Sequence, residues 1–362
     1  MNCITHSRQC PYQDEPQQGS GASSTIASPN EYLTDRSTTS KTASPTQVHA
    51  SPINLIITTP SVDMPYIELL QQWLNESYRS FVYNEEHAAV YGSSCLNNAL
   101  SHPFLMHGML AMAALHLNAK HTDKVHGYRQ HATQLINQAL GEFNLLPQLE
   151  PRSITAAFLF SNIVSAYQMC ECFSAINDGG DEFLDKFISC MRMCRGVSTV
   201  IHGWWPTLVE SELEPILSVS EQLGAEQDLD QHTAEFEALR ASIMSLESIN
   251  GAGTTKIYLD SIHQMQRIYN VQQALESPEL NSSTSWAFAW AVNMSLEMIN
   301  LLELRRPEAL VILAHYTPLL HYRRSSWVIG PAGAKMFVLL EGHLGRHWAP
   351  WLKWPRQRTQ HT

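Results

Sequence analysis

Apolar side chains recur at helical spacing through residues 53–355, and this periodicity narrows the possible folds to helical ones. Residues three and four positions apart share one face of an α-helix, so the pattern indicates helices that each bury one side. Runs that alternate every second residue between turns, which would predict β-hairpins, are absent. We therefore predict an all-α fold with a single large helical domain.

Individual helices are expected where caps and prolines precede the apolar positions. Ser101 is a candidate N-cap with Pro103 in the first turn, and it would open the helical stretch 102–119. Thr122 is the expected start of the next helix, and Ser153 is expected to cap a helix that is apolar nearly all round and therefore interior. Further periodic segments cover residues 66–81, 181–201, 233–250, 255–275, 285–304, 307–322, 331–344 and 346–354.

Composition limits the classes of partner. Hydrophobic residues make up 44% of the 362 residues and charged residues 16%, which is typical of a globular protein with a sizeable core. The net charge is −11 and the Lys and Arg residues form no basic run, so the chain as it stands is expected to bind nucleic acid poorly. The apolar stretch 154–169 is too short and too polar to span a membrane, and no secretory signal is visible. The seven cysteines, an odd number, suit a reducing intracellular compartment.

The first part of the chain differs in composition from the rest. Residues 14–52 are rich in Ser, Thr, Pro and Gln and contain few large apolar side chains, so we interpret them as a disordered linker. The expected organisation is a short cysteine-containing segment 1–13, the linker 14–52, a helical domain 53–355 and a tail 356–362.

Cys3 and Cys10 are separated by six residues and followed by Pro11 and Tyr12. This spacing resembles the last part of a fungal binuclear zinc cluster, in which C-x2-C-x6-C occurs twice and six thiolates hold two zinc ions. The partner expected three positions before Cys3 would precede Met1. The chain is therefore similar to a zinc-cluster transcription factor that begins inside its DNA-binding domain.

Two further blocks carry the resemblance into the helical region. Residues 102–117, HPFLMHGMLAMAALHL, and residues 306–316, RPEALVILAHY, resemble the C-terminal domain of fungal regulators of the sterol-uptake-control type. Trp327, Trp348 and the run 351–355 continue that pattern. The resemblance implies an all-helical regulatory domain, often dimeric, that holds a hydrophobic ligand and acts in the nucleus, with a cytoplasmic inactive state as an alternative.

The zinc cluster is incomplete in this sequence. Two thiolates in a flexible tail cannot close even one tetrahedral zinc site, so Cys3 and Cys10 are expected to bind zinc only if upstream sequence completes the cluster. Upstream coding sequence missing from the gene model is the favoured explanation, and loss of the DNA-binding domain by the gene is the alternative. A third interpretation is that Cys3 and Cys10 are two unrelated cysteines in a disordered tail.

The other groups of histidine, cysteine and glycine residues favour a structural role over metal binding or catalysis. His116, His121, His126 and His131 recur every five residues, a spacing that does not keep them on one helix face, and the pair His343 and His347 lacks a following glutamate. Cys190 and Cys194 are expected to behave as small buried hydrophobes. The glycine-rich stretch 251–256 lacks the ending of a phosphate-binding loop and is interpreted as a turn between helices. No catalytic motif is present, and we expect no enzyme.

A ligand cavity between helices is the remaining site hypothesis, because flexible Met side chains beside Ala and Gly leave room for a bulky apolar molecule. Ordinary core packing is the competing interpretation for each residue. The candidate lining residues are Phe104, Met106, Met109, Met112, Phe158, Trp286, Trp290 and Tyr316.

The leading hypothesis is a transcriptional regulator whose helical domain senses a hydrophobic ligand or a partner and controls sterol, lipid or specialised-metabolite genes. Its expected partners are promoter DNA, reached through a complete cluster or a full-length partner, a sterol or other apolar ligand, and a second copy of the chain. The alternative is a stand-alone ligand-binding or dimerising cofactor without direct DNA binding.

Overall fold

The computed structural model describes residues 63–82, 85–121, 125–176, 179–218, 233–274 and 284–360, with the side chains of 125, 126, 180, 196–202, 274, 285 and 286 left out. Residues 61–362 form one compact unit, and residues 1–60 lie outside the described residues. The proposed cluster segment 1–13 and linker 14–52 therefore also lie outside them.

Every regular element among the described residues is a helix and none is a strand, which confirms the all-α prediction. The elements are α1 (Met64–Asn75), η1 (Ser77–Phe81), α2 (Glu85–Ala99), α3 (Pro103–Lys120), α4 (Val125–Asn144), η2 (Pro151–Ser153), α5 (Ile154–Ser174), α6 (Gly180–His202), α7 (Trp205–Val209), α9 (Ala234–Ser245), α10 (Glu247–Asn250), α11 (Ala252–Ala274), α12 (Ser285–Asn293), α13 (Leu296–Glu303), α14 (Pro307–Tyr322), α15 (Ala332–Leu344), η4 (Arg346–Leu352) and α16 (Lys353–Gln360).

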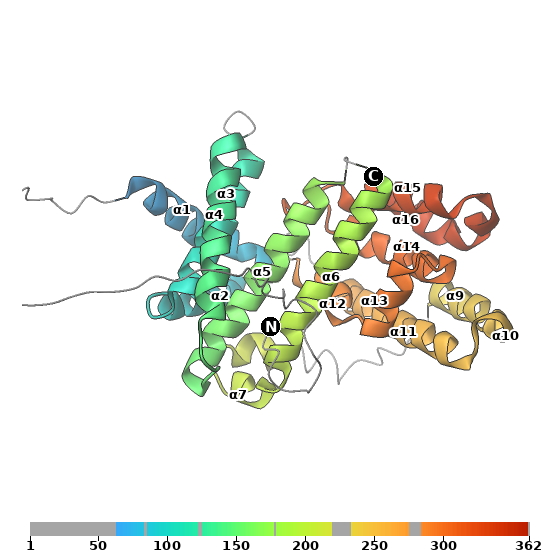
Figure 1. The fold of residues 1–362 in the computed structure, drawn as a ribbon, viewed down its shortest axis with the longest axis horizontal. Coiled ribbons are helices and arrows are strands. Elements are labelled where there is room, and N and C mark those ends of the chain that lie inside the picture. Colours follow the sequence, from blue (N-terminus) through green and yellow to red (C-terminus); the bar gives the residue numbers. More distant parts are fainter. Residues whose placement is uncertain are drawn as a thin grey trace, which may run out of the picture. The chain divides into compact units, whose positions relative to one another are not determined.

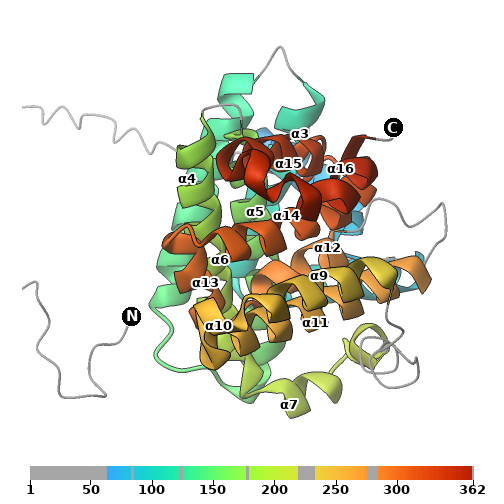
Figure 2. The same ribbon diagram turned by 90° about the vertical axis from the view of Figure 1, so that its right-hand side faces the viewer.

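Three helices form the interior. α3, α5 and α14 are buried on most of their surface, as expected for helices that are apolar nearly all round. α3 packs against α1, α4 and α5, and α5 packs against α6, so that these helices lie side by side (Figure 1). α14 packs against α11, α15 and α16 (Figure 2). The core of unit 61–362 is continuous through all of these helices.

α14 and α15 approach so closely that one position admits only glycine. A Cβ atom on Gly333 would lie 2.5 Å from the backbone nitrogen of His321. Such a contact is well inside van der Waals separation, so a larger residue would push the two helices apart. The sequence block 306–316 therefore begins a helix, α14, that packs closely against α15.

Several expected boundaries differ in the structure. α3 begins at Pro103 with His102 in the N-cap position, so the cap predicted at Ser101 was wrong by one residue. Ser153 does occupy the N-cap position of α5, but its hydroxyl bonds with the backbone of Glu150 at 3.0 Å rather than capping the helix. The predicted start at Thr122 lies outside the described residues.

The predicted helix 285–304 is in fact two helices. The chain becomes extended at Met294 and Ser295, and the Ser295 side chain accepts a hydrogen bond from the Met298 backbone nitrogen at 3.1 Å. A serine that caps a new helix start favours this break over a continuous helix. The segment 233–250 also divides into two helices, at a turn around Leu246 that has no side-chain cap.

Two α-helices escaped prediction, namely α2 and the short α7. α2 carries buried Ala88, Tyr91, Cys95 and Ala99 at helical spacing. Most of these side chains are small, and glycine, serine and asparagine residues occur around them, so the apolar stripe is inconspicuous in the sequence. The last helix also continues to Gln360, past the expected domain edge at residue 355, with Thr359 buried in its final turn.

Gly251 confirms the turn interpretation of the glycine-rich stretch. It has a φ of 80° and separates α10 from α11, and the remaining residues of the stretch form the first turn of α11. Positive φ is accessible to glycine at little cost, which explains a glycine at this junction.

Candidate functional site: an apolar cavity

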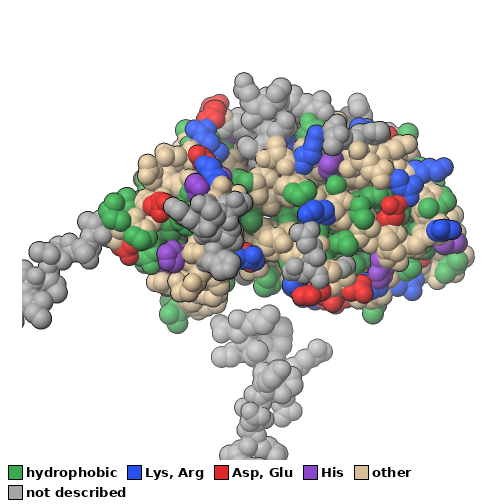
Figure 3. Space-filling view, turned by 90° about the horizontal axis from the view of Figure 1, so that it is seen from above, with side chains coloured by type: hydrophobic (Ala, Val, Ile, Leu, Met, Phe, Trp, Pro, Cys, Tyr) green, Lys and Arg blue, Asp and Glu red, His purple; other side chains and the backbone are tan. Residues whose placement is uncertain are grey.

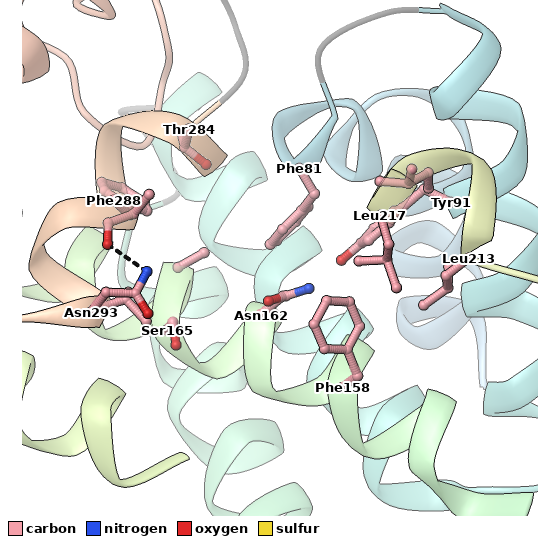
Figure 4. Close-up of a pocket in the computed structure, with 14 residues that line it drawn as sticks. Phe81, Tyr91, Phe158, Asn162, Ser165, Leu213, Leu217, Thr284, Phe288 and Asn293 are labelled. Carbon is pink, nitrogen blue, oxygen red and sulfur yellow. Dashed lines mark hydrogen bonds between the residues drawn. The ribbon is translucent and has the colours of Figure 1, made fainter. Parts of the chain in front are cut away.

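A cavity of about 380 Å³ lies between α2, α5, the segment 213–217 and α12 (Figure 4). This volume falls in the range of pockets that hold small molecules. Most of the lining side chains are apolar and a minority are polar, the usual composition of a ligand site. They are Phe81, Tyr91, Phe158, Asn162, Ser165, Ala166, Leu213, Ile216, Leu217, Thr284, Phe288, Ala289, Val292 and Asn293.

The inner wall of the cavity is one face of α5. Phe158, Asn162 and Ser165 follow one another at helical spacing and point into the cavity (Figure 4). These three side chains are partly exposed, while the residues around them on the same helix are buried. The cavity therefore exists because this single face of an interior helix is left without a packed neighbour.

Tyr91 from α2 forms a polar part of the opposite wall. Its ring stacks on Phe81, with ring centres 5.5 Å apart, and only 3% of its surface is exposed. The buried hydroxyl has no hydrogen-bond partner of normal geometry among the described residues, although the side chains of Asn162 and Cys95 lie near it. Burial raises the pKa of Tyr91 well above its usual value, so the hydroxyl stays protonated and can donate a hydrogen bond.

The cavity is joined to distant segments through Ser80. The backbone nitrogen and the hydroxyl of Thr284, which lines the cavity, both donate to the Ser80 carbonyl oxygen, at 3.0 and 2.9 Å. The indole nitrogen of Trp327 donates to the Ser80 hydroxyl at 2.9 Å. The end of η1 is thus held to the start of α12 and to the loop before α15.

Of the lining residues proposed from sequence, Phe158 lines this cavity. Phe104 packs edge-to-face against Phe143 and Phe160, and Met109 and Met112 are fully buried. Met106 is half-buried against the core.

The candidates of the C-terminal half also pack in the core. The rings of Trp290 and Tyr316 lie 4.8 Å apart, the Trp290 indole donates to the Ser261 carbonyl, and the Tyr316 hydroxyl donates to the Ala287 carbonyl. The side chain of Trp286 lies outside what the structure describes.

Sequence reasoning missed the polar lining residues. Asn162 is the clearest case, because an asparagine in the middle of an otherwise apolar interior helix requires a polar partner or a cavity. That signal was available in the sequence. Thr284 and Asn293 could not have been found in this way, because they lie at the two ends of a short helix whose limits the sequence does not reveal.

A second cluster, Ser77, His116 and Glu76, has the residue types of a hydrolase triad. The Ser77 hydroxyl lies 3.0 Å from His116 Nδ1, and Glu76 lies 3.9 Å from His116 Nε2. Ser77 is completely buried, so no substrate can reach its hydroxyl. Burial lowers the pKa of His116 to about 4, which also makes the imidazole a weak base.

The cluster is better explained as a structural tie. The His116 ring stacks on Trp327 with 4.3 Å between ring centres and 5° between planes, and Gln72 lies 3.1 Å from the same ring nitrogen. The cluster therefore joins α1, η1, α3 and the loop before α15.

Metal-ligating residues do not gather in the described part of the chain, where no group of three or more His, Cys, Asp or Glu side chains has metal-binding geometry. His343 lies 3.3 Å from Asp181, and His347 packs against Trp348. Cys3 and Cys10 lie outside the described residues. Cys190 and Cys194 are both buried on α6, as predicted for small hydrophobes.

One face of the molecule shows Lys and Arg mixed with acidic side chains among the described residues (Figure 3). On the face seen in Figure 3, Lys and Arg side chains are interspersed with Asp and Glu rather than gathered in one stripe. Among the helices that the structure describes, none has the length and apolarity needed to cross a bilayer.

Comparison with known proteins gives one match. Residues 68–196, about a third of the chain, match the family model described as the fungal specific transcription factor domain. Neither the curated proteins nor the solved structures contain a match to the chain. The matched residues run from α1 into α6 and include the α2 and α5 walls of the cavity, whereas α12 lies beyond them. The match supports a fungal transcription factor and points to no class of enzyme.

Proposed function

We propose that the protein is a transcriptional regulator whose helical domain senses an apolar ligand in the cavity between α5 and α12. The observation that carries this proposal is the cavity itself, whose α2 and α5 walls belong to the region that matches the transcription factor domain. The genes under control would be those of sterol or lipid metabolism or of a specialised-metabolite cluster.

The lining defines the ligand chemistry. An apolar body would contact Phe158, Phe288 and Val292, and a hydroxyl or carbonyl group at one end would meet Tyr91 and Asn162. Among the described residues, the buried Tyr91 hydroxyl has no hydrogen-bond partner of normal geometry, so a ligand oxygen there would accept a hydrogen bond from it. A sterol is one molecule with this distribution of polarity.

Ligand binding can influence the domain because the cavity walls come from segments far apart in the chain. A ligand shifts a conformational equilibrium only through unequal affinity for its two states. Bringing α12 against α5 and α2 creates the binding surface, so the ligand would favour this closed arrangement. Through Ser80, the same arrangement holds Trp327 and the loop before α15.

The regulator would reach promoter DNA indirectly or through additional sequence. Two thiolates, Cys3 and Cys10, do not fit a zinc site on their own, since a structural zinc ion takes four ligands. We therefore favour action in the nucleus through a homodimer or a full-length partner that carries a complete cluster. A ligand-binding cofactor without any contact with chromatin is the alternative.

Filling the cavity tests the proposal. The full chain, fused to a heterologous DNA-binding domain, would drive a reporter gene, and the purified protein would be extracted for apolar molecules and analysed by mass spectrometry. Ala289→Phe places a ring in the cavity, and the matched control Ala89→Phe places one on the exposed side of α2.

We expect the wild type and the control to carry the same apolar molecule, and Ala289→Phe to lose it together with ligand-dependent reporter output. Loss of the molecule with unchanged reporter output would favour the ligand-binding cofactor. A wild-type protein that carries no apolar molecule and whose thermal stability ignores added sterols would refute ligand sensing.

A further inference from the structure

A second pocket lies between α11, α14 and α16, outside the region that matches the family model. It has a volume of about 250 Å³ and is bounded by helices that pack directly on one another (Figure 2). Its lining is polar and contains no acidic residue. The lining residues are Tyr269, Gln272, Gln273, Pro318, His321, Tyr322, Arg324, Gln357 and Arg358.

Two guanidinium groups at this pocket lack a carboxylate partner among the described residues. Arg324 contacts only the His321 carbonyl oxygen, at 3.4 Å, and Arg358 forms no ion pair there. The neighbouring Arg356, by contrast, is neutralised by an ion pair with Glu341. The positive charge at the pocket is therefore uncompensated within the described chain.

Gln272 supplies an independent observation. Its side chain is only 1% exposed, yet its amide nitrogen has no hydrogen-bond partner among the described residues. Nearly all buried polar groups in proteins are paired, so an orphaned donor in a pocket wall indicates an acceptor that the protein itself does not supply. A small rotation of the side chain would turn this amide toward an oxygen bound in the pocket.

The surrounding charge favours the same kind of ligand. Residues 305–360 contain nine Lys and Arg against two Asp and Glu, whereas the whole chain contains 23 against 34. An anion would thus be repelled by most of the molecule and attracted to this part of it. Part of the excess lies on α16, which carries Lys353, Arg356 and Arg358, and part lies on Arg323 and Arg324 directly after α14.

We propose that the pocket between α11, α14 and α16 binds a small organic anion with a carboxylate or phosphate head. The head lies between Arg324 and Arg358 and accepts a hydrogen bond from Gln272. The rings of Tyr269 and Tyr322 bound the remaining space, which suits a compact metabolite rather than a drug-sized ligand. The site is separate from the apolar cavity and does not depend on its ligand.

Calorimetric titration of the full chain tests this site. Inorganic phosphate and citrate serve as probes at constant ionic strength, so that general screening stays fixed. The variants are Arg324→Gln, Arg358→Gln and Gln272→Leu. Arg152→Gln is the matched control, because Arg152 is a highly exposed arginine on η2, far along the chain from the pocket. Circular dichroism checks that each variant is folded.

We expect saturable binding of at least one probe with one site per chain. Each arginine variant should weaken it about tenfold or more, since charge-assisted hydrogen bonds are lost, and Gln272→Leu should weaken it several-fold. The control should bind as the wild type does. Binding of phosphate alone or citrate alone identifies the head group.

Three results would overturn the proposal. The first is the absence of saturable binding of either probe. The second is an equal loss in Arg152→Gln, which would indicate attraction to net charge alone. The third is binding of duplex DNA that depends on Arg324 and Arg358 while neither small anion binds, which would make this surface a nucleic-acid contact.

Discussion

Two buried histidines should make the domain unstable in mild acid. His116 is held by Ser77 and Gln72 and stacks on Trp327, and His315 Nδ1 lies 2.9 Å from the Val311 carbonyl oxygen. Burial lowers the pKa of each imidazole from 6.5 to about 4. Both rings are therefore neutral in the folded protein at pH 5, whereas in the unfolded chain both would be protonated.

The sign and size of the effect follow from this difference. Because the folded-state pKa lies below the unfolded-state value, the unfolded chain binds protons first as the pH falls. Stability is therefore full above pH 6.5 and is lost between pH 6.5 and 4. A pH of 5 lies about 1.5 units below the unfolded-state pKa. At about 1.4 kcal/mol per unit, each histidine therefore lowers the free energy of unfolding by about 2 kcal/mol at this pH.

Urea unfolding of the full chain at pH 7.5 and pH 5 measures the effect. Carboxylates contribute to the same pH range, so the informative quantity is the difference between variants in the free energy lost on acidification. His116→Gln and His315→Gln should each lose about 2 kcal/mol less than the wild type between the two pH values. His131→Gln, which alters an exposed histidine on α4, is the control and should match the wild type. Equal losses in all four proteins would show that these imidazoles are not buried in neutral form.

Three further substitutions test the packing. Gly333→Ala should destabilise the protein by about 1–3 kcal/mol in urea unfolding, because the new methyl group meets the α14 backbone. Gly342→Ala, in the same helix, places its methyl group in open space and should be neutral or slightly stabilising. Equal effects of the two substitutions would contradict the close approach of α14 and α15. Ser295→Ala should cost about 1 kcal/mol through loss of the α13 cap, and an unchanged midpoint would mean that the cap contributes nothing. Trp327→Phe keeps an aromatic ring but loses the hydrogen bond to Ser80, so we expect the free energy of unfolding to fall by about 1 kcal/mol. An unchanged free energy of unfolding would show that this hydrogen bond adds no net stability.

The fold class was predictable because burial leaves a periodic record along each helix. α5 was predicted as an interior helix, since apolar residues occupy almost every position, and α3 and α14 share that composition. The break at Ser295 was not recognisable, because the apolar periodicity continues across it on both sides. α2 was missed because its buried face is built mainly from small side chains.

The cavity was predictable only in part. Sequence shows that an interior helix such as α5 contains Phe158 and Asn162, but whether a neighbour covers that face depends on how far apart the surrounding helices stand. Met109 and Met112 illustrate the limit, since a flexible side chain can line a cavity or fill it. The pocket at Arg324 and Arg358 depends on three separate helices whose lining residues are spread over positions 269–358, and no local pattern reveals it.

The bond between Ser80 and Thr284 has a consequence for biosynthesis. Its two partners are 204 residues apart, so a ribosome must release α12 before the second wall of the cavity can close. Until then, the α5 face with Phe158 stays uncovered on the nascent chain and is available to chaperones or to an early-arriving lipid. Under the proposed function, ligand supply during translation would therefore govern how much of the protein matures.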